Sequence, residues 1–131
     1  ISLGLVGSEM CIRDSCYPVI TFGQDSTHKG SQRNLIGESP GKELINHLSN
    51  DKQVNSETPP TFLFHTDEDT LVPPENSVQF YLALRKAKVP AELHIYRKGR
   101  HGVGLAHQIS ATNAWSSACE EWMRGYGWLG K

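Results

Sequence analysis

The chain has 131 residues, of which 37% are hydrophobic and 21% are charged, and its formal net charge is −1. This length and balance fit one small globular domain and exclude a disordered tail. No run approaches the roughly 18 apolar residues of a membrane-spanning helix, and no long basic block points to a nucleic-acid partner. The three cysteines have neither metal-ligand spacing nor a disulfide framework, so we expect no metal site.

The first fifteen residues, ISLGLVGSEMCIRDS, stand apart from the rest of the chain. Residues 5–14 resemble, residue for residue, one translated reading frame of a transposase sequencing adapter. We therefore predict that residues 1–15 are an adapter-derived artefact and exclude them from the fold predicted here. A sequencing read that begins in an adapter continues into the middle of a gene. We therefore expect residues 16–131 to be the C-terminal part of a domain whose N-terminal part is missing.

The next part of the chain alternates between apolar and polar segments. The run CYPVITF is rich in β-branched and aromatic residues and predicts a strand over 16–22. The polar segment 23–37 predicts a loop. Apolar residues at helical spacing predict a helix over 39–50, with Ser39 as its N-cap and Pro40 as its first helical residue.

The second half of the chain gives stronger patterns. The apolar run 61–65 follows two prolines and is typical of a strand buried on both faces. An amphipathic helix is predicted over 76–88, an alternating strand near a sheet edge over 91–96, and a last helix over about 110–123. The order βαβαβα predicts an α/β fold, in which helical crossovers join parallel strands and cover the faces of the sheet.

Titratable residues follow two of the predicted strands. Three acids, Asp67, Glu68 and Asp69, come after the strand 61–65, and His101 comes after the strand 91–96. Ligands of open α/β sheets bind beyond the carboxyl ends of the strands. An acid and a histidine at successive strand ends are what a serine hydrolase needs, because the acid orients the imidazole and the imidazole takes the proton of the serine.

At these residues the chain resembles a known family. The segments are YPVI, HKGSQRNLIG, TPPTFLFHTDEDTLVPPENSVQFYLALRKAKVPAELHIY and GRHGVGL, and they are similar to the C-terminal half of an α/β-hydrolase. The group is that of acetyl- and feruloyl-esterase-like enzymes, which are related to the prolyl oligopeptidase-type hydrolases. The motif His-x-x-x-Asp-x-x-Val-Pro begins at His65 and places the family's acid at Asp69. The motif Gly-x-His-Gly begins at Gly99 and places the family's histidine at His101.

The nucleophile of such a triad is not expected in this chain. The family requires Gly-x-Ser-x-Gly on a strand–turn–helix elbow, and its chain order is Ser, Asp, His. Ser8 lacks both glycines; Ser39 matches the pattern, but Pro40 after it has no N–H for an oxyanion hole. The segment between Ser39 and Asp69 is also too short for the strand and crossovers that separate these residues in the fold. We therefore expect the serine and the oxyanion hole upstream.

The resemblance implies a serine hydrolase fragment. Its parent would cleave carboxylic esters, acetyl or other acyl groups on small-molecule or carbohydrate-linked alcohols, and the fragment alone would be inactive. Two alternatives stay open: a prolyl oligopeptidase-type serine peptidase, which would carry a propeller domain upstream, and a non-catalytic binding protein, which would not need both Asp69 and His101. No cofactor, metal, nucleic acid or membrane is implied. A secreted or periplasmic location would suit a polymer-associated esterase, and the sequence assigns none.

Two further histidines are interpreted from their positions. His28 lies in the segment that resembles the family's HKGS, where a substrate-side role competes with a surface role. His65 ends a predicted strand, and we interpret it as packed rather than catalytic. The loop 23–37 follows a predicted strand end and is expected to border the acyl pocket.

Overall fold

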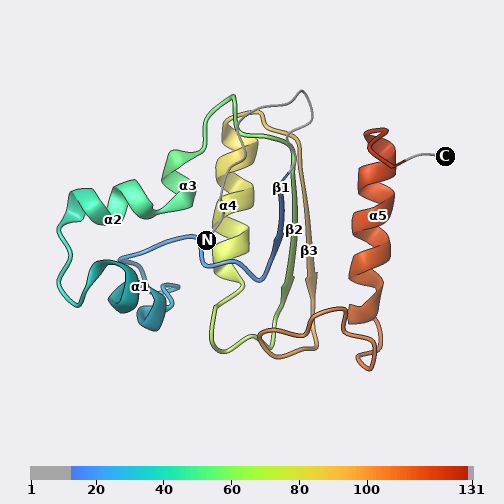
Figure 1. Ribbon diagram of the computed structural model, residues 1–131, viewed down its shortest axis with the longest axis horizontal. Coiled ribbons are helices and arrows are strands. Elements are labelled where there is room, and N and C mark those ends of the chain that lie inside the picture. The colour runs from blue at the N-terminus through green and yellow to red at the C-terminus, as the bar shows by residue number, and fades with distance from the viewer. Residues whose placement is uncertain (1–12, 130–131) are drawn as a thin grey trace.

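The computed structural model describes residues 13–129, which form a three-stranded parallel sheet with helices on both faces (Figure 1). The elements are β1 (Arg13–Cys16), α1 (Lys29–Ile36), α2 (Lys42–Leu48), α3 (Asn50–Gln53), β2 (Thr61–Thr66), α4 (Glu75–Lys86), β3 (Ala91–Tyr96), the 3-10 helix η1 (Thr112–Ala114) and α5 (Trp115–Gly125). In Figure 1, α4 lies on one face of the sheet and α5 on the other, and α1, α2 and α3 group on the outer side of α4. The predicted α/β class is confirmed.

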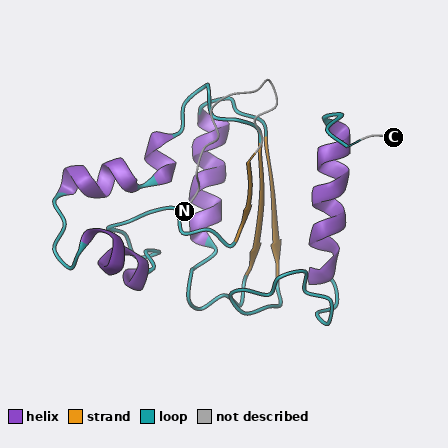
Figure 2. Cartoon of the chain, viewed as in Figure 1, coloured by secondary structure: helices purple, strands orange, loops and turns teal. Residues whose placement is uncertain are grey.

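The strand order β1-β2-β3 places β2 in the centre of the sheet. All six residues of β2 are buried, as its continuous apolar run predicted, because both faces carry a helix. β2 and β3 are parallel and in register from Thr61 opposite Ala91 to Thr66 opposite Tyr96. The loops that follow β2 and β3 therefore leave the sheet at the same edge (Figure 2).

The core consists of two clusters, one on each face of the sheet. Successive side chains of β2 alternate between them, as the pleat of a strand requires. The cluster on the α4 side comprises Ile20, Leu63, Phe80, Leu84 and Val89, and the cluster on the α5 side comprises Phe62, Phe64, Cys119 and Trp122. The two clusters pack against both faces of β2 and so position its carboxyl end.

The strand predicted over 16–22 was wrong in its position, because β1 is Arg13–Cys16. Tyr17 has a φ of 41°, which turns the chain out of the strand direction. The amides of Ile20 and Thr21 are bonded to a side chain instead of to a neighbouring strand, since both donate to Asn76. A pattern of apolar residues cannot distinguish this buried irregular segment from a strand.

The predicted artefact over 1–15 lies mostly outside the described residues, which begin at Arg13. Residues 13–15, the end of that segment, pair with β2 in β1, whereas we expected the sheet to begin at Cys16. The adapter origin of the opening segment stays a prediction.

The segment predicted as a loop over 23–37 contains the helix α1. Its N-cap is His28, whose Nδ1 accepts a hydrogen bond from the amide of Ser31 at 3.2 Å. Histidine is not among the usual capping residues, so the sequence offered no start signal. The helix predicted over 39–50 is also divided, into α2 and α3. Its N-cap is Gly41 and not Ser39, and the extended backbone of Ser49 separates the two helices.

The elements predicted in the second half are confirmed with small shifts of their ends. The last helix begins at Trp115, after the short η1. Of the helices within residues 13–129, none combines the length and the apolar character needed to cross a bilayer.

Candidate active site

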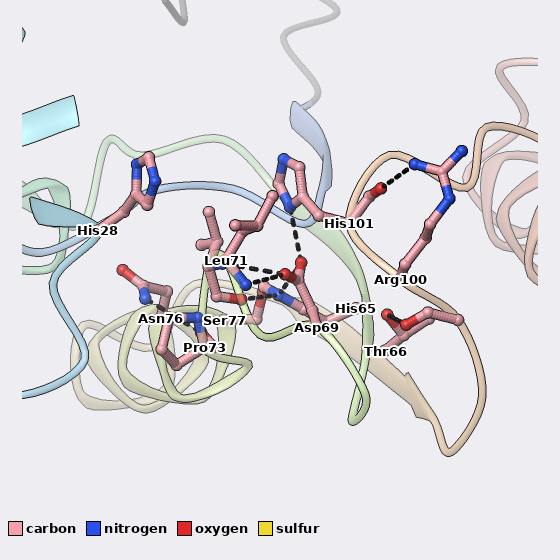
Figure 3. A network of polar contacts seen from close by, with 12 residues as sticks. His28, His65, Thr66, Asp69, Leu71, Pro73, Asn76, Ser77, Arg100 and His101 are labelled. Carbon is pink, nitrogen blue, oxygen red and sulfur yellow. Dashed lines mark hydrogen bonds and ion pairs between the residues drawn. The ribbon is translucent and has the colours of Figure 1, made fainter. Parts of the chain in front are cut away.

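The structure brings Asp69 and His101 together at the carboxyl edge of the sheet. Asp69 lies in the turn after β2, and His101 lies in the glycine-rich loop after β3 (Figure 3). The Nδ1 atom of His101 is 2.7 Å from the Oδ2 atom of Asp69. The side chain of Asp69 is 0% exposed and that of His101 is 30% exposed. A buried carboxylate therefore contacts an imidazole that solvent can reach.

The turn around Asp69 fixes its carboxylate. The Oδ1 atom accepts hydrogen bonds from the amides of Leu71 at 3.0 Å and Val72 at 2.9 Å, and the Oδ2 atom accepts one from His101. Burial by itself would raise the pKa of Asp69, but the N–H of Val72, the imidazole of His101 and the N–H of Leu71 together hold this pKa below its usual value. Asp69 is thus ionised at neutral pH.

The contact with Asp69 determines the tautomer of His101. An ionised carboxylate can only accept hydrogen bonds, so Nδ1 of His101 carries the proton that it shares with Asp69. In Figure 3 the other ring nitrogen, Nε2, points away from Asp69. In the neutral imidazole Nε2 has a lone pair, so it can accept a proton from a group placed on that side. This is the geometry of a general base with its orienting acid.

A second imidazole, that of His65, contacts the turn after β2 that carries Asp69, which we call the acid turn. His65 is fully buried; its Nδ1 is 2.7 Å from the hydroxyl of Ser77, and its Nε2 is 2.9 Å from the carbonyl oxygen of Val72. A carbonyl only accepts, so Nε2 carries the proton and Ser77 donates to Nδ1. The Nε2 atom also lies 3.3 Å from Oδ2 of Asp69.

Burial lowers the pKa of His65 and outweighs the carbonyl of Val72 and the carboxylate of Asp69, both of which raise it. His65 is therefore neutral and does not neutralise the carboxylate of Asp69, which is hydrogen-bonded to His101. Its complete burial agrees with the interpretation of His65 as a packed residue.

The histidine loop is joined to the end of β2 at Gly99. The hydroxyl of Thr66 donates to the carbonyl of Gly99 at 2.8 Å, and the amide of Gly99 donates to Glu68 at 3.2 Å. Gly99 has a φ of 138°, and a Cβ atom there would lie 3.0 Å from side-chain carbons of both Thr66 and Val103. A side chain at this position would be strained by the positive φ and would push these carbons aside by a few tenths of an ångström, so glycine suits the close approach.

This packing predicts different costs for alanine at two glycines of the loop. Gly102 also has a positive φ, of 75°, but among residues 13–129 a Cβ atom there would meet nothing within 4 Å beyond its own chain neighbours. Gly102→Ala adds backbone strain alone, whereas Gly99→Ala adds strain and overpacking. Urea unfolding is expected to show Gly99→Ala as less stable than Gly102→Ala by about 1 kcal/mol. Equal stability of the two variants would contradict the close packing at Gly99.

The remaining candidate residues lie outside this contact. Asp67 and Glu68 are exposed, and Ser39 is exposed in the bend between α1 and α2. In the described part of the chain, no serine hydroxyl is hydrogen-bonded to His101, and no group of three or more His, Cys, Asp or Glu residues could hold a metal ion. The imidazole of His28 serves as the cap of α1.

Sequence reasoning missed three residues that surround the pair. Asn76 and Ser77, in the first turn of α4, are both fully buried, and the ring of Tyr17 meets the ring of His101 edge-on with centroids 5.0 Å apart. The signal for Asn76 and Ser77 is that two small polar residues follow Val-Pro-Pro at the start of an amphipathic helix, where a buried polar group needs partners. No local signal marks Tyr17.

A family model described as the Prolyl oligopeptidase family matches residues 13–125 of this chain. Among solved structures, the chain is similar to an acetyl ester-xyloside bifunctional hydrolase from Caldicellulosiruptor lactoaceticus, with a TM-score of 0.87 and 45% identity. The similarity covers 91% of this chain and 43% of that one.

Two curated proteins are similar in sequence. An acetylxylan esterase from Xylanibacter ruminicola is 38% identical over 93 residues, which are 68% of this chain and 19% of that protein. A protein named endo-1,4-beta-xylanase B, from Butyrivibrio fibrisolvens, is 44% identical over 91 residues, which are 70% of this chain and 14% of that protein. The chain thus spans less than half the length of each of these relatives.

Proposed function

Because the chain belongs to the prolyl oligopeptidase family and has a partial α/β-hydrolase fold, we propose that Asp69 and His101 are two members of a Ser-Asp-His triad that hydrolyses carboxylic esters. The observation that carries this proposal is the 2.7 Å hydrogen bond between Nδ1 of His101 and Oδ2 of Asp69. The two residues follow adjacent parallel strands, where the ligands of such sheets bind.

In this mechanism Nε2 of His101 takes the proton of the serine hydroxyl while the serine oxygen attacks the ester carbonyl. The imidazole is then positively charged, and the carboxylate of Asp69 stabilises it through Nδ1. His101 next gives the proton to the leaving alcohol, which leaves an acyl-serine. A water molecule releases the acid by the same steps, with His101 again as the base.

We place the serine and the oxyanion-hole donors in a part of the protein other than residues 13–129. Two observations support this placement. Ser39, the one residue with a matching glycine pattern, is exposed in a bend and is followed by Pro40, which has no N–H to donate. The solved relative is more than twice as long as the region that matches. The chain by itself is therefore expected to be inactive.

The substrate class that we propose is an acetyl or other small acyl ester on a carbohydrate-linked alcohol. Its support is that the relatives named acetylxylan esterase and acetyl ester-xyloside bifunctional hydrolase are 38% and 45% identical to this chain. The family description also admits a serine peptidase, so the test includes a peptide substrate.

The test uses a fusion protein, in which residues 13–131 of this chain replace the matched region of the C. lactoaceticus hydrolase. The fusion is expected to hydrolyse nitrophenyl acetate and acetylated xylo-oligosaccharides, and to leave a chromogenic prolyl peptide intact. The 131-residue chain alone is expected to hydrolyse none of them. A folded fusion without esterase activity would contradict the proposed function. Hydrolysis by the chain alone, lost in His101→Ala, would contradict the external serine.

A further inference from the structure

The side-chain amide of Asn76 is completely buried at the start of α4, and both of its polar atoms are fully bonded. The Oδ1 atom accepts hydrogen bonds from the amides of Ile20 at 3.0 Å and Thr21 at 3.2 Å. The Nδ2 atom donates to the carbonyl oxygens of Ser26 at 2.7 Å and Pro73 at 3.0 Å. A primary amide offers two acceptor and two donor positions, and all four are used.

These bonds join two segments that lie far apart in the sequence. Pro73 belongs to the turn that carries Asp69, whereas Ile20 and Thr21 belong to the segment between β1 and α1. The amides of Ile20 and Thr21 are buried, and Asn76 is the acceptor that each of them has. The start of α4 therefore ties the segment after β1 to the acid turn.

The segment tied down by Asn76 begins with the residue that touches His101. The ring of Tyr17 lies edge-on to the ring of His101, with centroids 5.0 Å apart and an interplanar angle of 68°. Tyr17 has a φ of 41°, which is unfavourable for a residue with a side chain, and proline follows it. Such a conformation persists only where the surrounding structure holds it.

Tyr17 is held from both sides. Its amide donates to the carbonyl of Phe64 at 2.7 Å, which fixes it to the end of β2. Three residues later the chain is fixed again, because Ile20 donates to Asn76. Between these two points Pro18 restricts the backbone further. Loss of the Asn76 bonds is expected to free the chain at Ile20, so that the backbone of Tyr17 can leave its positive φ.

We propose that Asn76 is a positioning residue for His101, acting through the segment 17–21 to hold the ring of Tyr17 against the imidazole. A ring packed on one side of the imidazole limits its rotation, so that Nδ1 stays on Asp69 and Nε2 stays directed away from it. The catalytic meaning of this positioning rests on the proposed function, whereas the positioning itself is a property of the chain alone.

The test is NMR of the 131-residue chain, which reports on the imidazole of His101 without any nucleophile. The variants are Asn76→Ala, Tyr17→Leu and the double variant. Asn76→Ala and Tyr17→Leu are expected to shift the ring-proton signals of His101 in the same direction, because both remove the ring of Tyr17 from its face. The double variant is expected to add little to Tyr17→Leu. Amide exchange of Ile20 and Thr21 in Asn76→Ala is expected to be about tenfold faster or more.

The matched control is Thr61→Val, which removes a buried hydroxyl that donates to Pro59 at the opposite end of β2. If Asn76→Ala only lowers the unfolding midpoint, as Thr61→Val does, and leaves the His101 signals unchanged, the proposal is overturned. If Asn76→Ala does not fold, the unmodified chain decides: unprotected amides at Ile20 and Thr21 would overturn the proposal, and protected ones support it. An inactive fusion protein combined with the expected NMR shifts would refute the esterase function and leave this inference standing.

Discussion

Asp69→Asn in the fusion protein is expected to lower kcat for ester hydrolysis by about 10⁴-fold. The carboxylate of Asp69 accepts the Nδ1–H of His101 at 2.7 Å and receives two backbone amides on its other oxygen. An asparagine in the same place would direct its N–H₂ group either at Nδ1–H of His101 or at the two backbone amides, all of which are donors. The imidazole of His101 then turns or takes the other tautomer, and its Nε2 atom no longer accepts the proton of the serine.

The control for this prediction is Asp67→Asn, two residues earlier in the same loop. Asp67 is exposed and carries the same charge, whereas Asp69 is buried. The change of net charge is therefore the same in both variants, and only Asp69→Asn removes the partner of His101. Steady-state kinetics on nitrophenyl acetate measure both variants. Similar losses in the two variants, or a loss in Asp67→Asn alone, would show that the acid was assigned to the wrong residue.

The stability of the chain is expected to fall as the pH is lowered below about 6.5, because of His65. In the folded state, burial lowers the pKa of His65 below its ordinary value of 6.5, which the unfolded chain keeps. Between these two pKa values the unfolded chain binds a proton that the folded chain does not, so acidification favours unfolding. The slope is at most about 1.4 kcal/mol for each pH unit.

Urea unfolding at a series of pH values measures this slope. In His65→Gln the amide can still donate to Val72 but does not titrate, so the variant is expected to lose most of the slope. His107→Gln, at an exposed histidine, is expected to keep it. The lowered pKa of Asp69 acts in a separate window, because its carboxyl in the unfolded chain titrates near 3.8. An unchanged slope in His65→Gln would contradict the buried neutral imidazole.

The second half of the fold could be predicted from the sequence because its signals are local. Prolines precede β2 and β3, and the apolar run of β2 and the helical spacing in α4 each specify one kind of element. The first half could not be predicted in this way. The run around Ile20 has the composition of a strand, but its amides are bonded to Asn76, which lies 56 residues further along the chain. A short sequence window, such as the one used to recognise a strand or a helix, does not contain both partners.

The contact between Asp69 and His101 could be predicted because topology alone brings the ends of adjacent parallel strands together. The choice of Asp69 among three neighbouring acids came from the family motif, and it stays a prediction; in the structure Asp69 is buried beside two exposed acids. The surroundings of the pair required the structure. Tyr17 reaches His101 only because its backbone adopts a positive φ, and nothing in its side chain or its neighbours announces that conformation.

Labelling with a fluorophosphonate, followed by mapping of the modified residue by mass spectrometry, tests whether His101 activates a serine that lies outside residues 13–129. The probe reacts with a serine that a histidine has activated, so it identifies the nucleophile without any assumption about substrate. We expect the fusion protein to be labelled at a serine of its C. lactoaceticus part, and this labelling to be lost in His101→Ala. The 131-residue chain alone should stay unlabelled. Labelling of Ser39, or of any serine within residues 13–129 of the chain alone, would contradict a nucleophile outside these residues.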